Sequence, residues 1–167
     1  MECFFIPMTN ETARLVLAWR YEPPYDFYNA DPRSIEDDLQ SMTNPRQPYF
    51  SVHDSRSELV GFRCFGLEAQ VPGGDYDSGA LDTGGGLRPD LTGRGLGLSV
   101  LQSGLAFGRQ LFNPPAFRVT VAAFNARAQV VCQRSGFQPV ASFERPSDGL
   151  GFIVMRRLEG RADLGWA

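Results

Sequence analysis

Residues 87–99 read Leu-Arg-Pro-Asp-Leu-Thr-Gly-Arg-Gly-Leu-Gly-Leu-Ser, which places three alternating glycines between a strand-like segment and a long apolar helix. The first amides of a helix have no intrahelical partner and lie at the positive end of its dipole, and glycines let a phosphate approach closely. The stretch therefore predicts an anion site. Leu98 and Val100 break the spacing of a dinucleotide fingerprint and of a P-loop. A glycine-rich connection without a ligand is the alternative.

Apolar periodicity defines the segments that follow this turn. Apolar residues recur at helical spacing over 95–112 and predict a helix there, which the Asn-Pro-Pro of 113–115 ends. The later segments are predicted as a strand at 117–123, a helix at 125–135, and strands at 136–143 and 150–158.

The segments before the turn are predicted as a strand at 4–8, a helix from 9 or 10 to 19, a helix over 35–42, and a hairpin of strands at 49–53 and 58–66. Ser34 and Asp37 resemble a capping box for the second helix. A further strand begins near Ala80, although Gly84–Gly86 make it a poor strand by propensity. Either something approaches that backbone closely or a bulge forms.

The order β-α-α-β-β-β-α-β-α-β-β predicts an α+β fold, with a mixed, largely antiparallel sheet flanked by helices. A chain of 167 residues fits one domain, residues 1–167. The net charge of -3 gives no basic surface for nucleic acid or an anionic membrane. Three widely spaced cysteines and a single histidine, His53, argue against disulfides and a metal site. We expect a cytoplasmic protein, because no signal peptide or membrane helix is evident.

Two motifs resemble those of the Gcn5-related N-acetyltransferases (the GNAT family). Thr92–Gly97 is similar to motif A, Gln/Arg-x-x-Gly-x-Gly/Ala, although Thr92 lacks the long polar side chain of the first position. Asn125-Ala-Arg-Ala128, followed by Gly136-Phe137, is similar to motif B. The resemblance covers roughly residues 58–158 and implies the acyl-CoA N-acyltransferase fold, with acetyl-CoA between two parallel strands that splay apart.

The resemblance also implies the residues that would bind acetyl-CoA, with no metal required. The backbone of 87–89 would pair with the pantetheine arm, and residues 94–99 would hold the pyrophosphate. Asn125 would contact the pantetheine or the thioester region, and it could equally be a helix N-cap. The expected cofactor residues are Leu87, Arg88, Pro89, Arg94, Gly95, Leu96, Gly97, Leu98, Ser99 and Asn125.

Transfer to an amine requires a base, because an amine of pKa near 10 is mostly protonated at neutral pH. Asp82 lies near the position where many family members carry a glutamate, with Asp75, Asp77 and Glu22 as substitutes for this role. The alternative for Asp82 is a solvated or structurally bonded carboxylate. Cys132 stands where the family has a tyrosine as general acid. A buried cysteine is otherwise an inert small hydrophobe.

The acceptor site is expected in the aromatic loop that joins the first two helices, at Tyr21, Glu22, Tyr25 and Tyr28. The implied function is acetyl-CoA-dependent N-acetylation of a primary amine, on a small molecule or a peptide, by direct attack in a ternary complex. A catalytically idle acyl-CoA-binding module and a structural interaction domain without CoA are the alternatives. Dimers are common in the family, so a homodimer is a further expectation.

Overall fold

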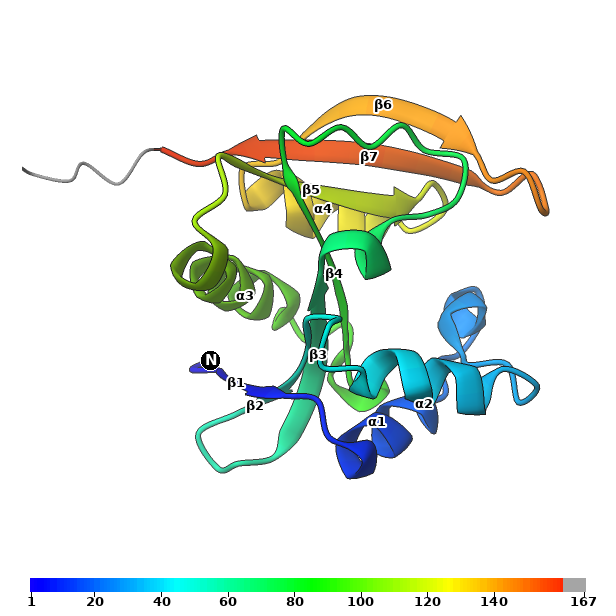
Figure 1. The fold of residues 1–167 in the computed structure, drawn as a ribbon, viewed down its shortest axis with the longest axis vertical. Helices are drawn as coiled ribbons and strands as arrows, with labels where there is room; N and C mark the ends of the chain where they lie inside the picture. The colour runs from blue at the N-terminus through cyan, green and yellow to red at the C-terminus, as the bar shows by residue number, and fades with distance from the viewer. Residues whose placement is uncertain (161–167) are drawn as a thin grey trace, which may run out of the picture.

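The computed structural model describes residues 1–160, so residues 161–167 of the expected domain lie outside the described part. The helices and strands follow in the predicted order (Figure 1). They are β1 (Phe4–Pro7), α1 (Asn10–Leu17), α2 (Ile35–Thr43), β2 (Tyr49–His53), β3 (Leu59–Phe65), β4 (Leu81–Leu87), α3 (Gly97–Phe112), β5 (Ala116–Ala122), α4 (Ala126–Arg134), β6 (Gln138–Glu144) and β7 (Gly151–Leu158). Short 3₁₀ turns lie at η1 (Tyr25–Tyr28), η2 (Gly66–Ala69) and η3 (Pro89–Leu91).

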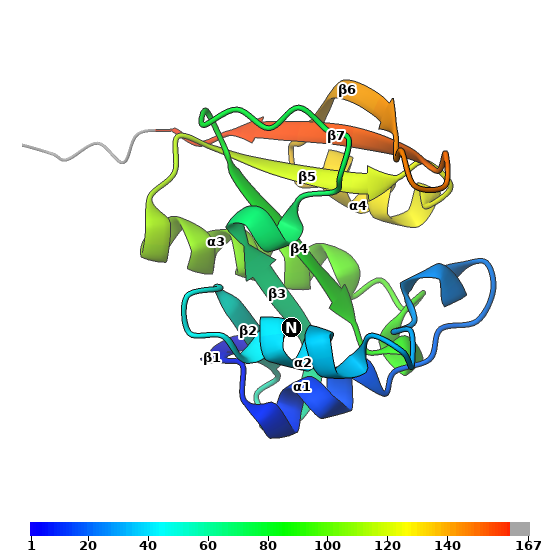
Figure 2. The same cartoon turned by 45° about the vertical axis from the view of Figure 1, so that its right-hand side comes forward.

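The strands form one 7-stranded sheet in the order β1-β2-β3-β4-β5-β7-β6. All neighbours are antiparallel except β4 and β5. These two strands pair only at Leu81 with Phe117 and at Asp82 with Arg118, and then diverge. Figures 1 and 2 show α1, α2 and β1–β3 at one end of the molecule, and β5–β7 with α4 at the other. The predicted mixed sheet with a splayed parallel pair is confirmed.

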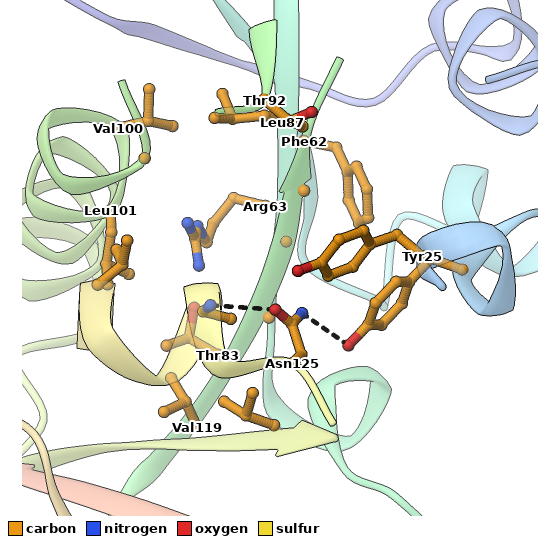
Figure 3. A pocket seen from close by; sticks show the side chains of 18 of the residues that line it. Tyr25, Phe62, Arg63, Thr83, Leu87, Thr92, Val100, Leu101, Val119 and Asn125 are labelled. Atoms are coloured by element: carbon orange, nitrogen blue, oxygen red, sulfur yellow. Dashed lines mark hydrogen bonds between the residues drawn. The ribbon is translucent and has the colours of Figure 1, made fainter. Parts of the chain in front are cut away.

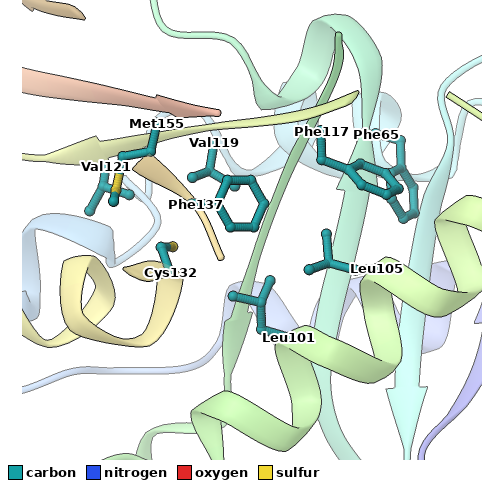
Figure 4. Packing of buried hydrophobic residues seen from close by; sticks show 9 residues of the cluster. All are labelled: Phe65, Leu101, Leu105, Phe117, Val119, Val121, Cys132, Phe137 and Met155. Carbon is teal, nitrogen blue, oxygen red and sulfur yellow. The ribbon is translucent and has the colours of Figure 1, made fainter. Parts of the chain in front are cut away.

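The main core lies between α3, α4 and one face of the sheet (Figure 4). Phe65, Phe117 and Met155 are fully buried in it. Their burial stabilises the fold by about 25 cal/mol per Å² of apolar surface removed from water. A second cluster packs α1 and α2 on the other face and contains Met8, Ala13, Val16, Leu17, Leu39 and Met42. The two faces are therefore covered by different helix pairs.

The starts of α1 and α2 differ in their capping. Thr9 caps α1 in a capping box with Thr12, which satisfies two backbone groups of the first turn. The capping box predicted from Ser34 and Asp37 is wrong. Ser34 has φ -107° and ψ 0°, away from the extended backbone of a side-chain N-cap, and its hydroxyl instead donates to Asp38 Oδ2 at 2.9 Å.

Gly84–Gly86 of β4 are explained by close neighbours rather than by a bulge. The register between β3 and β4 is continuous from Gly61–Leu87 to Phe65–Thr83. A Cβ on Gly85 would collide with the carbonyl oxygen of Phe62, and one on Gly86 would lie 2.9 Å from the Phe62 ring. The predicted close approach is confirmed, and it leaves β4 without side chains along one wall of the cleft described below.

None of the helices in residues 1–160 combines the length and apolar character needed to cross a bilayer. The same part of the chain has no group of three or more His, Cys, Asp or Glu side chains placed to hold a metal ion.

Candidate active site

A cleft of about 710 Å³ lies where β4 and β5 diverge (Figure 3). One wall comes from α1, α2, the loop between them and the start of β2, and includes Trp19 and Tyr49. The opposite wall comes from β5 and α4, and Gly84–Leu87 of β4 lie between them. The N-terminus of α3 closes one end through Gly93, Gly95 and Gly97. The cleft is therefore the space that the missing β4–β5 hydrogen bonds leave open.

The glycine-rich turn has the geometry of an anion cradle. Gly93 and Gly95 have φ of +73° and +76°, which L side chains rarely adopt, and α3 begins at Gly97. Within residues 1–160 no side chain caps this helix start. Its first amides therefore point toward the cleft end without a side-chain acceptor. Gly95, Gly97 and Leu98 line the cleft as expected, whereas Arg94, Leu96 and Ser99 do not.

Arginines of α4 add positive charge beside this turn. The Arg127 guanidinium lies 3.8 Å from the ring centroid of Tyr25, in a cation–π contact, and Arg127 Nη1 lies 3.7 Å from the place of a Cβ on Gly93. Arg134 also lines the cleft. Sequence reasoning missed both residues, since motif B assigns no role to them.

The backbone after β4 is already engaged at several points. The Arg88 amide donates to the Val60 carbonyl at 2.9 Å, and its guanidinium pairs with Asp90 at 2.7 Å. The Leu87 carbonyl accepts from the Tyr21 hydroxyl at 2.6 Å. Leu87 lines the cleft, and Arg88 and Pro89 do not. Of the expected pantetheine segment, only Leu87 reaches the cleft.

Solved structures with this arrangement are numerous, at low sequence identity. The chain superposes on a spermidine N-acetyltransferase SpeG chimera from Vibrio cholerae and hSSAT with TM-score 0.70 and 15% identity. This match covers 95% of the present chain and 96% of the chimera. The chain also superposes on AAC(6')-Ib in complex with ribostamycin and coenzyme A with TM-score 0.74 and 14% identity. This match covers 98% of the present chain and 99% of AAC(6')-Ib. The chain has the acyl-CoA N-acyltransferase fold.

A third structure with this acyltransferase fold is a GNAT-family acetyltransferase from Bacillus anthracis, with TM-score 0.72 and 14% identity over 95% of both chains. No protein-family model matches the sequence. No curated protein matches it either.

Asn125 joins the two walls of the cleft. Its Oδ1 accepts from the Ala128 amide at 3.0 Å, which is the N-cap of α4, and its Nδ2 donates to the Tyr28 hydroxyl at 2.9 Å (Figure 3). The N-cap alternative is confirmed. The same side chain holds Tyr28 of the aromatic loop over the cleft.

The wall of the cleft that contains the loop between α1 and α2 is called the aromatic wall below. It contains most of the expected acceptor residues and two carboxylates that sequence reasoning missed. Tyr21, Tyr25 and Tyr28 line the cleft, whereas Glu22 is exposed outside it. The missed carboxylates are Asp38 of α2 and Glu68 of η2.

Hydrogen bonds orient the Glu68 carboxylate, which accepts from Ser41 Oγ at 2.9 Å and from Gln47 Nε2 at 2.6 Å. Burial raises the pKa of the Tyr49 phenol, and the nearby Cys64, Glu68 and Asp38 raise it further. Glu68 and Asp38 thus act on the same phenol, and together they give this wall a negative potential.

Asp82 does not lie in the cleft. Its carboxylate accepts from Arg118 Nε at 2.6 Å, from Arg118 Nη2 at 2.8 Å and from Gln70 Nε2 at 2.8 Å. Asp82 and Arg118 are 3% and 4% exposed, and they form one of the two β4–β5 residue pairs. This placement gives Asp82 a structural role where the strands join, and it does not suit the expected base. Of the proposed substitutes, Asp77 also binds Arg118, and neither Asp77, Asp75 nor Glu22 lines the cleft.

Cys132 lies on α4 at the floor of the cleft and belongs to the main core (Figure 4). Burial raises the pKa of its thiol to about 11. A leaving CoA thiolate corresponds to a thiol of pKa about 8.5, so a less acidic thiol would donate its proton uphill. This environment favours the packing role over the role of general acid.

Arg63 of β3 is a buried cation in the cleft of this acyltransferase fold (Figure 3). The residue is 8% exposed, and its Nε is buried without a hydrogen-bond partner. Within residues 1–160 its guanidinium has neither an ion pair nor a hydrogen bond to any side chain. Burial lowers the pKa of Arg63, yet an arginine stays charged at physiological pH.

Proposed function

We propose that the chain is an N-acyltransferase that moves an acyl group from a CoA thioester to a primary amine, with acetyl-CoA as the donor expected from the sequence. One observation carries the proposal. A single cleft, opened by the divergence of β4 and β5, has the uncapped start of α3 at one end and an aromatic wall with two carboxylates beside it.

The α3 end suits the diphosphate of CoA. The amides of 95–98 would bind its oxygens, because a helix start offers both unpaired donors and a favourable dipole. Arg94 and Arg127 would add charge at the rim, where screening by salt is strongest. The pantetheine arm would then follow the glycine backbone of β4, which has no side chains to exclude it.

The aromatic wall suits a cationic amine. Tyr25 and Tyr28 offer ring faces for an alkylammonium group, and Asp38 and Glu68 balance its charge. We assign Glu68 as the base that takes the amine proton, directly or through a water, because two neutral donors hold its carboxylate in place. Asp38 would bind the ammonium form.

The reaction follows from this placement. The neutral amine nitrogen attacks the thioester carbonyl carbon in a ternary complex, the C–S bond breaks, and CoA leaves as a thiolate. Positioning alone supplies much of the rate, since holding two reactants together removes about 7–11 kcal/mol of barrier in favourable cases. A general acid supplied by the protein is the catalytic group that the reaction needs least, because the thiolate is a good leaving group without protonation.

The similar structures support a small cationic acceptor over a peptide. One is an enzyme named for spermidine, and another holds ribostamycin with coenzyme A. An amine with several cationic groups would match the carboxylates and rings of the aromatic wall.

The test has two stages. Thermal unfolding with and without CoA first measures binding, where a ligand at 100 times its Kd stabilises by about 2.7 kcal/mol. Thiol release from acetyl-CoA is then measured with a panel of polyamines, aminoglycosides and short peptides. Turnover with at least one amine is the expected result. CoA binding without turnover would favour the idle module, and no stabilisation by CoA would favour the interaction domain.

A further inference from the structure

An unpaired arginine lies at the bottom of the cleft, away from the phosphate cradle. Gly104 of α3 lies beside Arg63, and a Cβ on Gly104 would lie 2.9 Å from Arg63 Nε. Gly104 follows Gly97 by two turns of α3, which is about 10 Å along the helix at 1.5 Å per residue. The guanidinium therefore lies farther along α3 than the glycine turn, beside Gly85 of the β4 backbone that the proposed pantetheine arm would follow.

Among residues 1–160, none places an anion beside the Arg63 guanidinium. The titratable groups that affect its pKa electrostatically are the thiols of Cys64 and Cys132, which burial keeps protonated. A buried charge is costly unless it is paired, because the low dielectric around it replaces water. A ligand that brings an anion to this point would remove that cost.

Space around the guanidinium depends on glycines. A Cβ on Gly85 of β4 would lie 3.1 Å from Arg63 Cζ, and the corresponding atom on Gly104 would touch Nε. Both glycines therefore leave room for the arginine where a larger residue would displace it. Thr83, Leu101 and Val119 line the same part of the cleft (Figure 3).

Strand alternation places Arg63 on the donor side of the sheet. Neighbouring residues of a strand point to opposite faces. Phe62 packs against Trp19, with ring centroids 6.3 Å apart, on the face that α1 and the aromatic loop cover. Arg63 points to the other face, toward α3. An anion bound by Arg63 would thus belong to the acyl donor rather than to the amine acceptor.

We infer that Arg63 forms an acyl subsite for a donor whose acyl group ends in a carboxylate, such as malonyl-, succinyl- or glutaryl-CoA. The inference rests on the proposed function. The amine nitrogen forms the amide bond with the thioester carbonyl carbon, the C–S bond breaks, CoA leaves as a thiolate, and the amine proton passes to Glu68. The terminal carboxylate stays bound to Arg63 and is unchanged in the product.

The experiment compares donors of equal length with and without the terminal charge. Thiol release is measured with acetyl-CoA and with the pairs propionyl- and malonyl-CoA, butyryl- and succinyl-CoA, and valeryl- and glutaryl-CoA, at a fixed amine concentration and with enzyme-free blanks for spontaneous thioester hydrolysis. A charged hydrogen bond predicts that kcat/KM for at least one carboxyacyl donor exceeds that of its uncharged counterpart by about 10- to 100-fold. Equal or better use of the uncharged donor in all three pairs would overturn the inference.

Variants then attribute the preference to Arg63. Arg63→Met should reduce the ratio of succinyl- to butyryl-CoA turnover to about one or below, and Arg63→Lys should keep part of it. Arg33→Met, at an exposed site outside the cleft, is the matched control and should keep the full ratio. Should Arg63→Met fail to fold, the donor series on the unaltered protein still decides.

Other outcomes have distinct meanings. An equal loss for all donors in Arg63→Met would place the guanidinium at the thioester oxygen and overturn the carboxylate subsite. A preference that follows a carboxylate on the amine, tested with amino-acid and decarboxylated acceptors, would overturn the assignment to the donor. Failure of the proposed function would be recognised separately. In that case, unacylated CoA would not raise the thermal stability, and no donor would release thiol.

Discussion

The Tyr21 hydroxyl donates a 2.6 Å hydrogen bond to the main-chain carbonyl of Leu87, and so fastens the aromatic loop to the end of β4. Burial raises the pKa of this phenol to about 12, so it is a neutral donor at physiological pH. The position of the aromatic wall thus depends on β4, along which we propose that the pantetheine arm lies.

Removing this hydroxyl in Tyr21→Phe should loosen the loop. We expect kcat/KM for the amine to fall about 5-fold, the value of one hydrogen bond of ~1 kcal/mol, and the Kd of unacylated CoA to change less than about 2-fold. Steady-state kinetics and calorimetry measure the two quantities. An unchanged kcat/KM for the amine would mean that this hydrogen bond does not position the aromatic wall.

The cradle can be tested at Gly95, where φ is +76° and a Cβ would meet nothing within 4 Å. Gly95→Ala therefore introduces backbone strain without a clash, at a cost of about 1 kcal/mol. We expect weaker CoA binding by about 5-fold or more. Gly149→Ala is the control, because its φ of +69° and open surroundings are similar and it lies in the turn before β7. It should lower stability comparably and leave CoA affinity unchanged.

Glu68→Gln removes the proposed base while keeping the size of the side chain. We expect kcat to fall about 100-fold or more at neutral pH, the usual effect of losing a general base. The deficit should narrow as pH approaches the pKa of the amine, about 10, since the nucleophile then loses its proton to solvent. Asp38→Asn should mainly raise the amine KM. Equal deficits of Glu68→Gln at pH 7 and pH 10 would exclude Glu68 as the base.

Asp82→Asn should affect stability rather than chemistry. It replaces the buried carboxylate beside Arg118 with a neutral amide and leaves the exposed Asp77 as an anionic partner, and breaking a buried ion pair costs up to about 3–5 kcal/mol. Urea unfolding should show this loss, while kcat of the folded fraction stays within about 3-fold of the unaltered protein. A large fall in kcat with unchanged stability would restore Asp82 as the catalytic base.

The buried thiols make stability fall in alkaline solution. Burial raises the pKa of Cys64 and of Cys132 from 9.0 to about 11 in the folded chain. Stability that depends on the protonated thiols is complete below pH 9, and it is lost as pH rises toward 11, by about 2 kcal/mol for each thiol. Cys132→Ala should show a shallower fall in the free energy of unfolding between pH 9 and 11. The same slope in both proteins would contradict this account.

The order of elements was predictable because it depends on local signals. Apolar spacing defined α3, and the Asn-Pro-Pro after it fixed the end of that helix. Helix starts were less predictable: α3 begins at Gly97 rather than at the predicted Gly95, since positive φ at Gly93 and Gly95 keeps them outside the helix. Side-chain caps depend on backbone angles that spacing does not give, hence the wrong capping box at Ser34.

The site was predictable only where it is made of backbone. The glycine turn has a sequence signature, whereas Glu68 is placed by contacts with Ser41 and Gln47, which are 27 and 21 residues away. The sequence does not distinguish Arg63 from other polar residues of a strand. Its place in the cleft follows only from the register with β4 and from the absence of a side chain at Gly104. The contacts of Asp82 were unpredictable for the same reason, because its partner Arg118 comes from a distant strand.

The sheet holds together at its centre through two residue pairs and one ion pair, between Leu81–Asp82 and Phe117–Arg118. Beyond this point, the backbone groups of β4 and β5 that face the gap have no strand to bond to. A ligand with amide groups along its length would make hydrogen bonds to these backbone groups, in place of those that β4 and β5 do not make with each other. Amide hydrogens bordering the gap should then exchange more slowly once ligand is bound, and the two halves of the molecule should unfold as a single cooperative unit.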